Sequence, residues 1–406
     1  MQNDTPPSSG TPKGPLHGVL IADFSRVLAG PYATMLLADL GADVIKIESR
    51  SGDDTRHWTP PMRGEVGTYF ISVNRNKRSI ALDLSDQADR EVAASIADRA
   101  DVLVENLKPG GMARFALDYP SVSERNPGIV YCSISGFGSG KGSRLPGYDL
   151  LAQGISGLMA LTGDPDGAAT RSGISVFDVT TGLHAAIGIL AALHHRDATG
   201  TGQHVETNLL SSALSAMVNQ SSAYVAGGVV PRRMGQAHLS IFPYEPFPTA
   251  DGELIVVAAN DGQFRRLCEV LEMPWVATDP RFARAADRNL NRGELAPLLI
   301  QRLAHKGSQE WFALLTAAGL PCGPINTVEG GIRTATDLGL EPVVLAGGTI
   351  PTVRNPLSFS ATPPHYEGAP PDLDADGDQI RRWLCAGRTD SMVAAKMEGP
   401  ASTADQ

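Results

Sequence analysis

Apolar positions in the first 210 residues form short strand-like runs separated by longer helical stretches. The run of branched residues at 18–24 predicts a strand. Pro31 suits the first turn of a helix over 32–40, with Gly41 as its C-terminal cap, and 44–47 predicts a second strand. A strand, a helix and a second strand in close succession are typical of the parallel crossover unit.

The same alternation continues to about residue 210. Further strands are expected at 79–82, 102–104, 129–134 and 204–209. One further helix is expected to start at Ser85 or Asp86, and two more are expected over 149–161 and 178–196. The helix over 178–196 is apolar almost all round, which predicts that it is buried. Alternating strands and helices predict an α/β fold, a Rossmann-like large domain with a doubly wound, mostly parallel sheet.

The alternation of strands and helices ends after Ala223, where a linker rich in glycine and arginine begins. A strand at 254–258 and amphipathic helices at 263–271, 292–303 and 309–317 predict a smaller α+β domain, and short strands are expected near 343–346 and 349–353. The predicted organisation is a disordered leader (1–14), the N-terminal part of the large domain (15–210), a linker helix (211–227), the small domain (228–325), a return segment completing the large domain (326–390) and a disordered tail (391–406).

Composition narrows the possible functions. The net charge of −10 argues against nucleic acid as a partner, although local basic clusters can still bind an anionic ligand. The four cysteines are far apart and form no Cys-x-x-Cys motif, which indicates a reducing, cytoplasmic setting. No apolar run approaches the 18 residues typical of a membrane span, and no metal-ligand spacing is present, so neither a membrane nor a metal is expected.

Three segments at predicted strand ends are candidates for binding phosphate. The turn at 25–31 joins the first strand to the first helix, where free backbone N–H groups favour an anion. The basic segment 74–79 and the segment 105–110, which leads to Arg114, offer further cations. Each is also compatible with a structural interpretation, an ordinary connection for 25–31 and a solvated basic turn for the other two. The glycine fingerprint for NAD or flavin is absent, so neither cofactor is expected.

Asp178 stands at the predicted start of the apolar helix, and two interpretations are open for it. Aspartate is a preferred N-cap residue, which makes a structural role the simpler interpretation. A carboxylate at a helix N-terminus can also act as a covalent nucleophile, with the helix stabilising negative charge that develops nearby.

Together these motifs resemble those of the class III coenzyme A transferases, the family of formyl-CoA transferase and carnitine CoA-transferase. The resemblance extends from about Leu16 to beyond Pro324, and the order and spacing of its motifs are specific although each motif alone is weak. The motifs are SRVLAGP at 25–31, LGADVIKIE at 40–48, GDDTR at 52–56, NRNKRS at 74–79, DVLVEN at 101–106, Tyr148-Asp149, Asp178, TGTGQ at 199–203 and GLPCGP at 319–324.

The resemblance implies a fold, a partner and a reaction. Similar proteins have a Rossmann-like large domain and a small domain, and they form homodimers in which the two chains interlock. By resemblance, Asp178 attacks an acyl-CoA and carries CoA as an aspartyl-CoA thioester. The implied CoA-binding residues are Arg26, Val27, Leu28, Ala29, Ser49, Arg50, Asn106, Leu107, Arg114 and Tyr148. The formyl-CoA member has an arginine where this chain has Ser49 and a lysine where it has Pro146.

Within the family, the chain looks closest to enzymes that move CoA from succinyl-CoA to dicarboxylic acids. A second carboxylate on the substrate requires a fixed cation, preferably an arginine. The candidates are Arg171, Arg75 and Arg26, and His238 lies in a segment that could close over the thioester. An ordinary surface charge is the alternative interpretation for each.

Two alternative functions remain at this stage. The α-methylacyl-CoA racemases are similar, but their catalytic histidine is replaced here by Tyr148, whose ordinary pKa near 10 is far from that of a base at neutral pH. The second alternative is a protein that binds CoA without catalysis.

Overall fold

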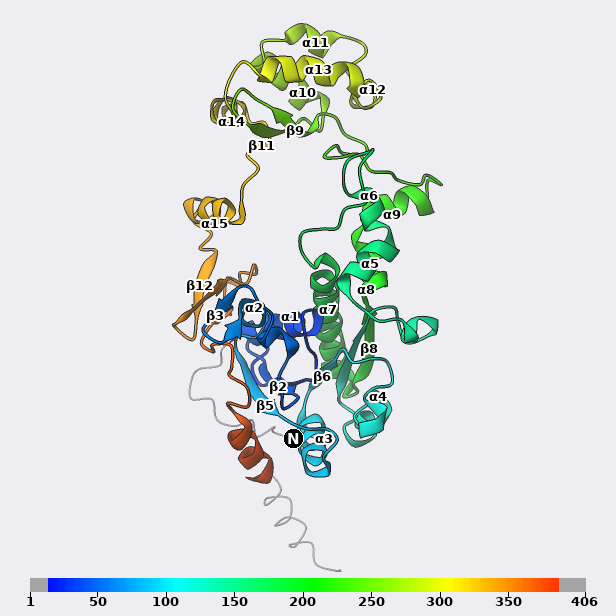
Figure 1. Cartoon of the computed structure of the whole chain (residues 1–406), viewed down its shortest axis with the longest axis vertical. Helices are drawn as coiled ribbons and strands as arrows, with labels where there is room; N and C mark the ends of the chain where they lie inside the picture. Colours follow the sequence, from blue (N-terminus) through cyan, green and yellow to red (C-terminus); the bar gives the residue numbers. More distant parts are fainter. Residues whose placement is uncertain (1–13, 387–406) are drawn as a thin grey trace, which may run out of the picture. The chain divides into compact units, whose positions relative to one another are not determined.

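The computed structural model describes residues 14–386, which divide into two compact units. Of the described residues, the first unit contains 14–156, 173–222 and 341–386, and the second contains 157–172 and 223–340. Figure 1 labels many of the helices and strands of both units. The predicted leader and tail lie outside the described residues, except for Gly14.

A six-stranded sheet forms the centre of the first unit, and all five strand pairs in it are parallel. In spatial order its strands are β5 (Lys77–Ala81), β2 (Asp43–Glu48), β1 (Leu20–Asp23), β6 (Val102–Glu105), β7 (Val130–Ser135) and β8 (Gln203–Asn208). This order confirms the predicted α/β class. Because every strand runs the same way, all the carboxyl ends meet at one edge, where the loops that could bind a ligand gather.

Helices cover both faces of this sheet (Figure 1). Apolar side chains from α1 (Ala29–Asp39) and α7 (Val176–Thr199) share one core with Ile21 and Val44. Side chains from α3 (Gln87–Arg99) and α4 (Tyr119–Arg125) share the opposite core with Ala22 and Ile45. Neighbouring residues of one strand therefore enter opposite cores, as the alternation of side chains along a strand requires.

Helix α7 is the one helix within residues 14–386 that is long and apolar enough to cross a bilayer by length and composition. One of its faces packs on the sheet through Ala185, Ile189 and Leu193, which are buried. The core helix of a folded domain meets the same criteria. Leu183, Ile187 and Leu190 of α7 are exposed, so the prediction that this helix is buried holds for one face only.

The helix predicted over 149–161 is interrupted. The structure has α5 (Asp149–Ser156) and α6 (Leu158–Leu161), separated by Gly157 with a φ of 97°. This left-handed conformation is easy for glycine and stops helical hydrogen bonding. The division between the two units falls at the same residue.

The second unit is built on a three-stranded antiparallel sheet in the order β11-β10-β9. Phe264, Leu299 and Trp311 are buried in the core that the helices form with this sheet. Its elements include β9 (Tyr244–Pro248), β10 (Glu253–Val257), α10 (Asp261–Val270), α11 (Pro274–Thr278), α12 (Ala285–Leu290), α13 (Arg292–Leu303), α14 (Ser308–Ala317), β11 (Cys322–Gly323) and α15 (Val328–Asp337). The unit also includes 157–172 and extends to 340, so its boundaries differ from the predicted 228–325.

Residues 341–386 belong to the first unit and contain the hairpin of β12 (Val343–Ala346) and β13 (Ile350–Val353). Asp376 and Asp374 accept hydrogen bonds from the backbone N–H groups of Ser79 and Ala81, on the edge strand β5. The segment predicted as a linker helix, 211–227, lies within two short helices and the turn after them. The first unit also contains β3 (Met62–Arg63), β4 (Val66–Gly67), α2 (Thr68–Val73), α8 (Leu209–Ala216), α9 (Val218–Val225, of which the last three residues belong to the second unit) and a helix at 377–386.

Candidate active site

The turn between β1 and α1 is held in a strained conformation. Val27 has a φ of 69°, a left-handed value that is a genuine outlier for a β-branched residue. Its N–H donates to Asp53 Oδ2 at 3.1 Å. The Asn106 side chain forms two hydrogen bonds to the backbone of Arg26, the residue before Val27. Its Oδ1 accepts from Arg26 N at 2.9 Å, and its Nδ2 donates to Arg26 O at 2.7 Å. These contacts fix the backbone where the sequence predicted a phosphate or CoA contact.

Buried ion pairs lie directly beneath this turn. Lys46 Nζ donates to Asp53 Oδ2 and to Ser25 O, each at 3.0 Å, and both charged side chains are inaccessible to solvent. Burial alone would raise the pKa of Asp53, but Lys46 and hydrogen bonds from Thr55 outweigh it and lower that pKa to about 2. Asp53 is therefore a permanently ionised support for the turn.

The rest of the 52–56 motif also supports the fold. Arg56 forms a bidentate ion pair with Glu48, in which Nε donates to Oε2 at 2.9 Å and Nη2 donates to Oε1 at 2.7 Å. The N–H of Asp53 donates to the same Glu48 Oε2 at 2.9 Å. The motif that carried the family resemblance thus joins the loop after β2 to the end of that strand.

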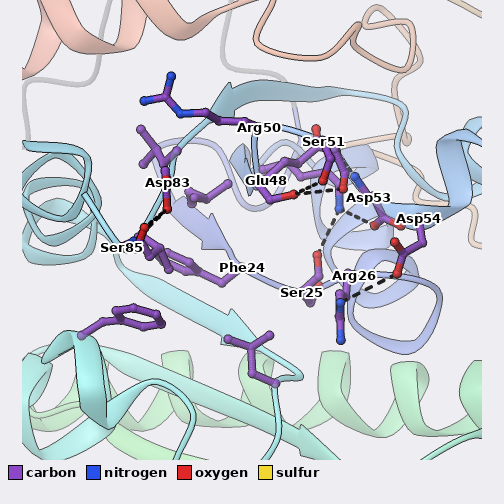
Figure 2. Close-up of a pocket in the computed structure, with 18 of the residues that line it drawn as sticks. Phe24, Ser25, Arg26, Glu48, Arg50, Ser51, Asp53, Asp54, Asp83 and Ser85 are labelled. Atoms are coloured by element: carbon purple, nitrogen blue, oxygen red, sulfur yellow. Dashed lines mark hydrogen bonds and ion pairs between the residues drawn. The ribbon is translucent and has the colours of Figure 1, made fainter. Parts of the chain in front are cut away.

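A cavity of about 650 Å³ opens over the strand ends (Figure 2). We call it the strand-end cavity. Arg50, at its rim, pairs with Asp89 at 3.0 Å, and Arg26 lies 3.8 Å from Asp54 in a solvent-exposed pair. Five of the ten residues predicted to bind CoA line this cavity: Arg26, Ser49, Arg50, Leu107 and Arg114.

A second cavity, of about 360 Å³, contains Asp178, and we call it the Asp178 cavity. It shares Arg26, Asp54 and Leu107 with the strand-end cavity, so the two adjoin at the β1–α1 turn. The other five predicted CoA-binding residues line it: Val27, Leu28, Ala29, Asn106 and Tyr148. The structure therefore brings all ten residues and Asp178 into two neighbouring cavities.

Asp178 does not cap its helix, so the capping interpretation is wrong. Helix α7 begins at Val176, which places Asp178 in the first turn. The capping group is Asp149, whose Oδ1 accepts from the N–H groups of Phe177 at 2.7 Å and Asp178 at 3.1 Å, while Gln153 donates to its other oxygen. Within residues 14–386 no hydrogen bond reaches the Asp178 carboxylate, which leaves both its oxygens available to a substrate.

The protonation of Asp178 is shifted towards neutral pH. Burial, followed by the negative charge of Asp149, raises the pKa of Asp178 to about 7. A carboxylate that is poorly solvated is a stronger nucleophile than one in water, and half of it is ionised near pH 7. This combination of a perturbed pKa and a cavity is typical of a reactive group.

The Asp149→Asn variant should remove the negative charge of residue 149 while keeping its capping hydrogen bonds to α7. Asparagine is an equally good N-cap, so α7 should keep its start, but the negative charge that raises the pKa of Asp178 is lost. If the reaction requires ionised Asp178, kcat/KM for the CoA exchange that the family resemblance implies should rise with pH through the pKa near 7 in the unmodified protein. In the variant, the rise of kcat/KM should occur at lower pH. An unchanged pH profile in a folded variant would contradict the coupling.

Arg75 belongs to the scaffold, which corrects its assignment to substrate. Its guanidinium is buried and pairs with Asp39 through Nε at 2.8 Å and Nη2 at 2.6 Å. Nη1 donates to Thr352 Oγ1 at 3.0 Å and to the carbonyl of Val353 at 3.1 Å. It lines neither of the two cavities.

Arg171 and His238 belong to the second unit, whereas Asp178 belongs to the first. Arg171 is exposed. His238 accepts a hydrogen bond from the N–H of Ser240 at 3.0 Å through Nδ1, and its ring contacts Tyr244 with centroids 5.0 Å apart. Their roles towards a substrate carboxylate stay predictions.

Sequence reasoning did not assign a binding role to several residues of the Asp178 cavity: Asp54, Trp58 and Arg144. It also missed the role of Asp149, although the Tyr148-Asp149 pair was part of the family pattern. Asp149 precedes Asp178 by 29 residues in sequence, and only folding brings the starts of α5 and α7 together. Among residues 14–386, no group of three or more His, Cys, Asp or Glu side chains is arranged to hold a metal ion.

Comparison with known proteins identifies the family. The family model of CoA-transferase family III matches residues 16–377. This protein belongs to CoA-transferase family III. It is therefore a CoA-transferase, an enzyme whose substrates include CoA thioesters, and the predicted family is confirmed.

Individual relatives agree with this assignment. The transferase is 39% identical over 380 residues to a succinate–glutarate CoA-transferase of Agrobacterium fabrum, covering 91% of this chain and 95% of the relative. It is 41% identical to a succinyl-CoA:mesaconate CoA-transferase of Haloarcula hispanica, covering 89% and 94%. A crystal structure of a CaiB/BaiF family protein from Brucella suis matches with a TM-score of 0.82 and 39% identity, covering 92% of this chain and all of that one.

Proposed function

We propose that this CoA-transferase moves CoA from succinyl-CoA to a small dicarboxylic acid through an aspartyl-CoA thioester on Asp178. The observation that carries the proposal is the Asp178 carboxylate, which lines a cavity and accepts no hydrogen bond within residues 14–386. The relatives named for succinyl-CoA and for dicarboxylic acids support the choice of donor and acceptor.

The proposed reaction consists of four carboxylate and thiolate exchanges. Asp178 attacks the thioester carbonyl of the donor and expels CoA as a thiolate, which leaves a mixed anhydride. The thiolate attacks the aspartyl carbonyl, releases succinate and forms the aspartyl-CoA thioester. The acceptor carboxylate then attacks that thioester, and the released thiolate takes the acceptor acyl group and frees Asp178. No proton is gained or lost overall, and the N-terminus of α7 favours the developing negative charge.

The two cavities suit the two ends of an acyl-CoA. The larger strand-end cavity would take the nucleotide, with Ser49, Arg50 and Arg114 near its phosphates, and the β1–α1 turn would guide the pantetheine arm towards Asp178. Asn106 would act mainly by holding that turn, since its side chain already bonds to Arg26. Arg171 and His238 remain candidates for the acceptor.

An interlocked homodimer is proposed as the working assembly. Support comes from large apolar side chains that are exposed on the first unit, Leu183, Ile187 and Leu190 on α7 and Leu150 and Ile155 on α5. Exposed large apolar side chains of this kind are often covered in a subunit interface. The cytoplasm is the proposed location, in keeping with four cysteines that form no disulfide in the structure.

Exchange between succinyl-CoA and isotope-labelled acids tests the proposed activity. We expect labelled CoA thioesters from C4 or C5 dicarboxylic acids, identified by mass, and no product when free CoA replaces succinyl-CoA. Tight binding of CoA with no exchange would favour a binding protein. Uptake of deuterium at Cα of a 2-methylacyl-CoA in D₂O without an acceptor acid would favour a racemase.

A further inference from the structure

We propose that Arg144 binds the distal carboxylate of the acyl group in the Asp178 cavity and so selects dicarboxylic over monocarboxylic acids. The inference rests on the proposed function and adds a specificity-determining residue to it. It starts from the Asp178 cavity, which contains two carboxylates, Asp54 and Asp178, and three cations, Arg26, Lys108 and Arg144.

The three cations are not equivalent. Arg26 also lines the strand-end cavity and lies 3.8 Å from Asp54, so it belongs to the junction between the cavities. Lys108 also lines a third cavity beside β6, β7 and β8. Of the cavities described, Arg144 lines the Asp178 cavity alone. Within residues 14–386 its guanidinium has no hydrogen bond or ion pair, so it is available to a ligand.

Backbone packing fixes the loop that carries Arg144. The loop leaves the end of β7 at Gly136 and returns at Gly147, just before Tyr148. The two glycines are in direct contact, since a methyl group on Gly136 would lie 2.4 Å from the Cα of Gly147. The carbonyl of Gly136 accepts from Leu210 N at 3.1 Å, which ties the base of the loop to the start of α8.

Hydrogen bonds inside the loop also hold its conformation. A short 3₁₀ helix at Lys141–Arg144 carries the guanidinium, with Ser143 N donating to Gly140 O at 3.1 Å and Leu145 N donating to Gly142 O at 3.0 Å. Arg144 is therefore presented from a loop closed at its base, immediately before the residues that start α5 and cap α7.

The positive charge of Arg144 can offset the negative charge of the distal carboxylate on the substrate. An acceptor dicarboxylate attacks the aspartyl-CoA thioester with one carboxylate, and its other carboxylate brings a second negative charge into a cavity that also contains Asp54. A guanidinium can bind that second carboxylate with two parallel hydrogen bonds. A succinyl donor and a dicarboxylic acceptor both carry the distal group, so one arginine would serve both halves of the reaction.

The test compares glutarate with pentanoate, which has the same chain length but lacks the distal carboxylate. Arg144→Gln should lower kcat/KM for glutarate by about 10- to 100-fold, mainly through KM, the effect of losing a hydrogen bond between charged groups. For pentanoate, kcat/KM should be unchanged or higher, and the Kd of free CoA should stay within about twofold. Lys141→Gln, in the same 3₁₀ helix but outside the cavity lining, is the matched control.

Three results would overturn the inference. They are equal losses for glutarate and pentanoate, no loss for either acid, and a loss of selectivity in Lys108→Gln instead of Arg144→Gln. An unmodified enzyme that transfers CoA to no dicarboxylic acid would overturn the proposed function itself, and that result is read before any variant is made.

Discussion

Replacing Asp178 by alanine is expected to abolish CoA exchange, with a loss on the order of 10³-fold or more. The reason is that the proposed reaction stores CoA on this side chain, and the other carboxylate that lines the Asp178 cavity, Asp54, is not in the first turn of an α-helix. Exchange of labelled succinate into succinyl-CoA measures the loss. In the unmodified protein, borohydride or hydroxylamine added with succinyl-CoA should modify Asp178, which peptide mass spectrometry can locate.

The same variant should fold normally, which separates catalysis from stability. Asp178 does not cap α7, because Asp149 does. The folded state raises the pKa of Asp178 to about 7, so it favours the protonated form. Stability from this group is therefore lost as the pH rises from the unfolded value near 4 to about 7. Above pH 7 the alanine variant should be at least as stable as the unmodified protein. Exchange within tenfold of the unmodified rate would refute the covalent mechanism.

Replacing Asp53 by alanine is expected to cost about 3–5 kcal/mol of folding free energy, because it leaves the buried Lys46 ammonium without its partner. The change also removes the acceptor for the Val27 N–H, which supports a strained residue of the turn. Urea unfolding followed by circular dichroism measures the first effect. A higher Kd for CoA, measured by calorimetry on the folded variant, measures the second.

The neighbouring Asp54 supplies a matched control for stability. Its side chain is 62% exposed and lies 3.8 Å from an equally exposed Arg26, so Asp54→Ala should change stability by less than about 1 kcal/mol. Equal stability changes at the two positions would mean that the buried pair contributes no more than a surface pair.

Most helices and strands could be predicted because their signals are local. The crossover units, the cap at Asp86 and the strand at 102–104 appear in the structure within a few residues of their predicted bounds. The helix at 149–161 was predicted as continuous because its apolar pattern runs on past Gly157. The backbone conformation of that glycine, with a φ of 97°, divides it.

The candidate site could be predicted only in part. The CoA-binding residues were found through motifs at strand ends, and parallel pairing brings those ends together. Arg75 was assigned to substrate because a basic segment looks the same in sequence whether its arginine faces a ligand or a buried aspartate. Asp39, which neutralises it, precedes it by 36 residues.

The sequence by itself determined the fold class, the family and the importance of Asp178, because these depend on local periodicity and on motifs in a fixed order. Tertiary structure decided which carboxylate caps α7 and which is left free to react. That choice depends on Asp149 arriving from another helix to accept the first N–H groups of α7. A contact between helix ends that are far apart in the chain leaves no periodic signal, and it brings close to Asp178 a negative charge that helps burial to raise its pKa.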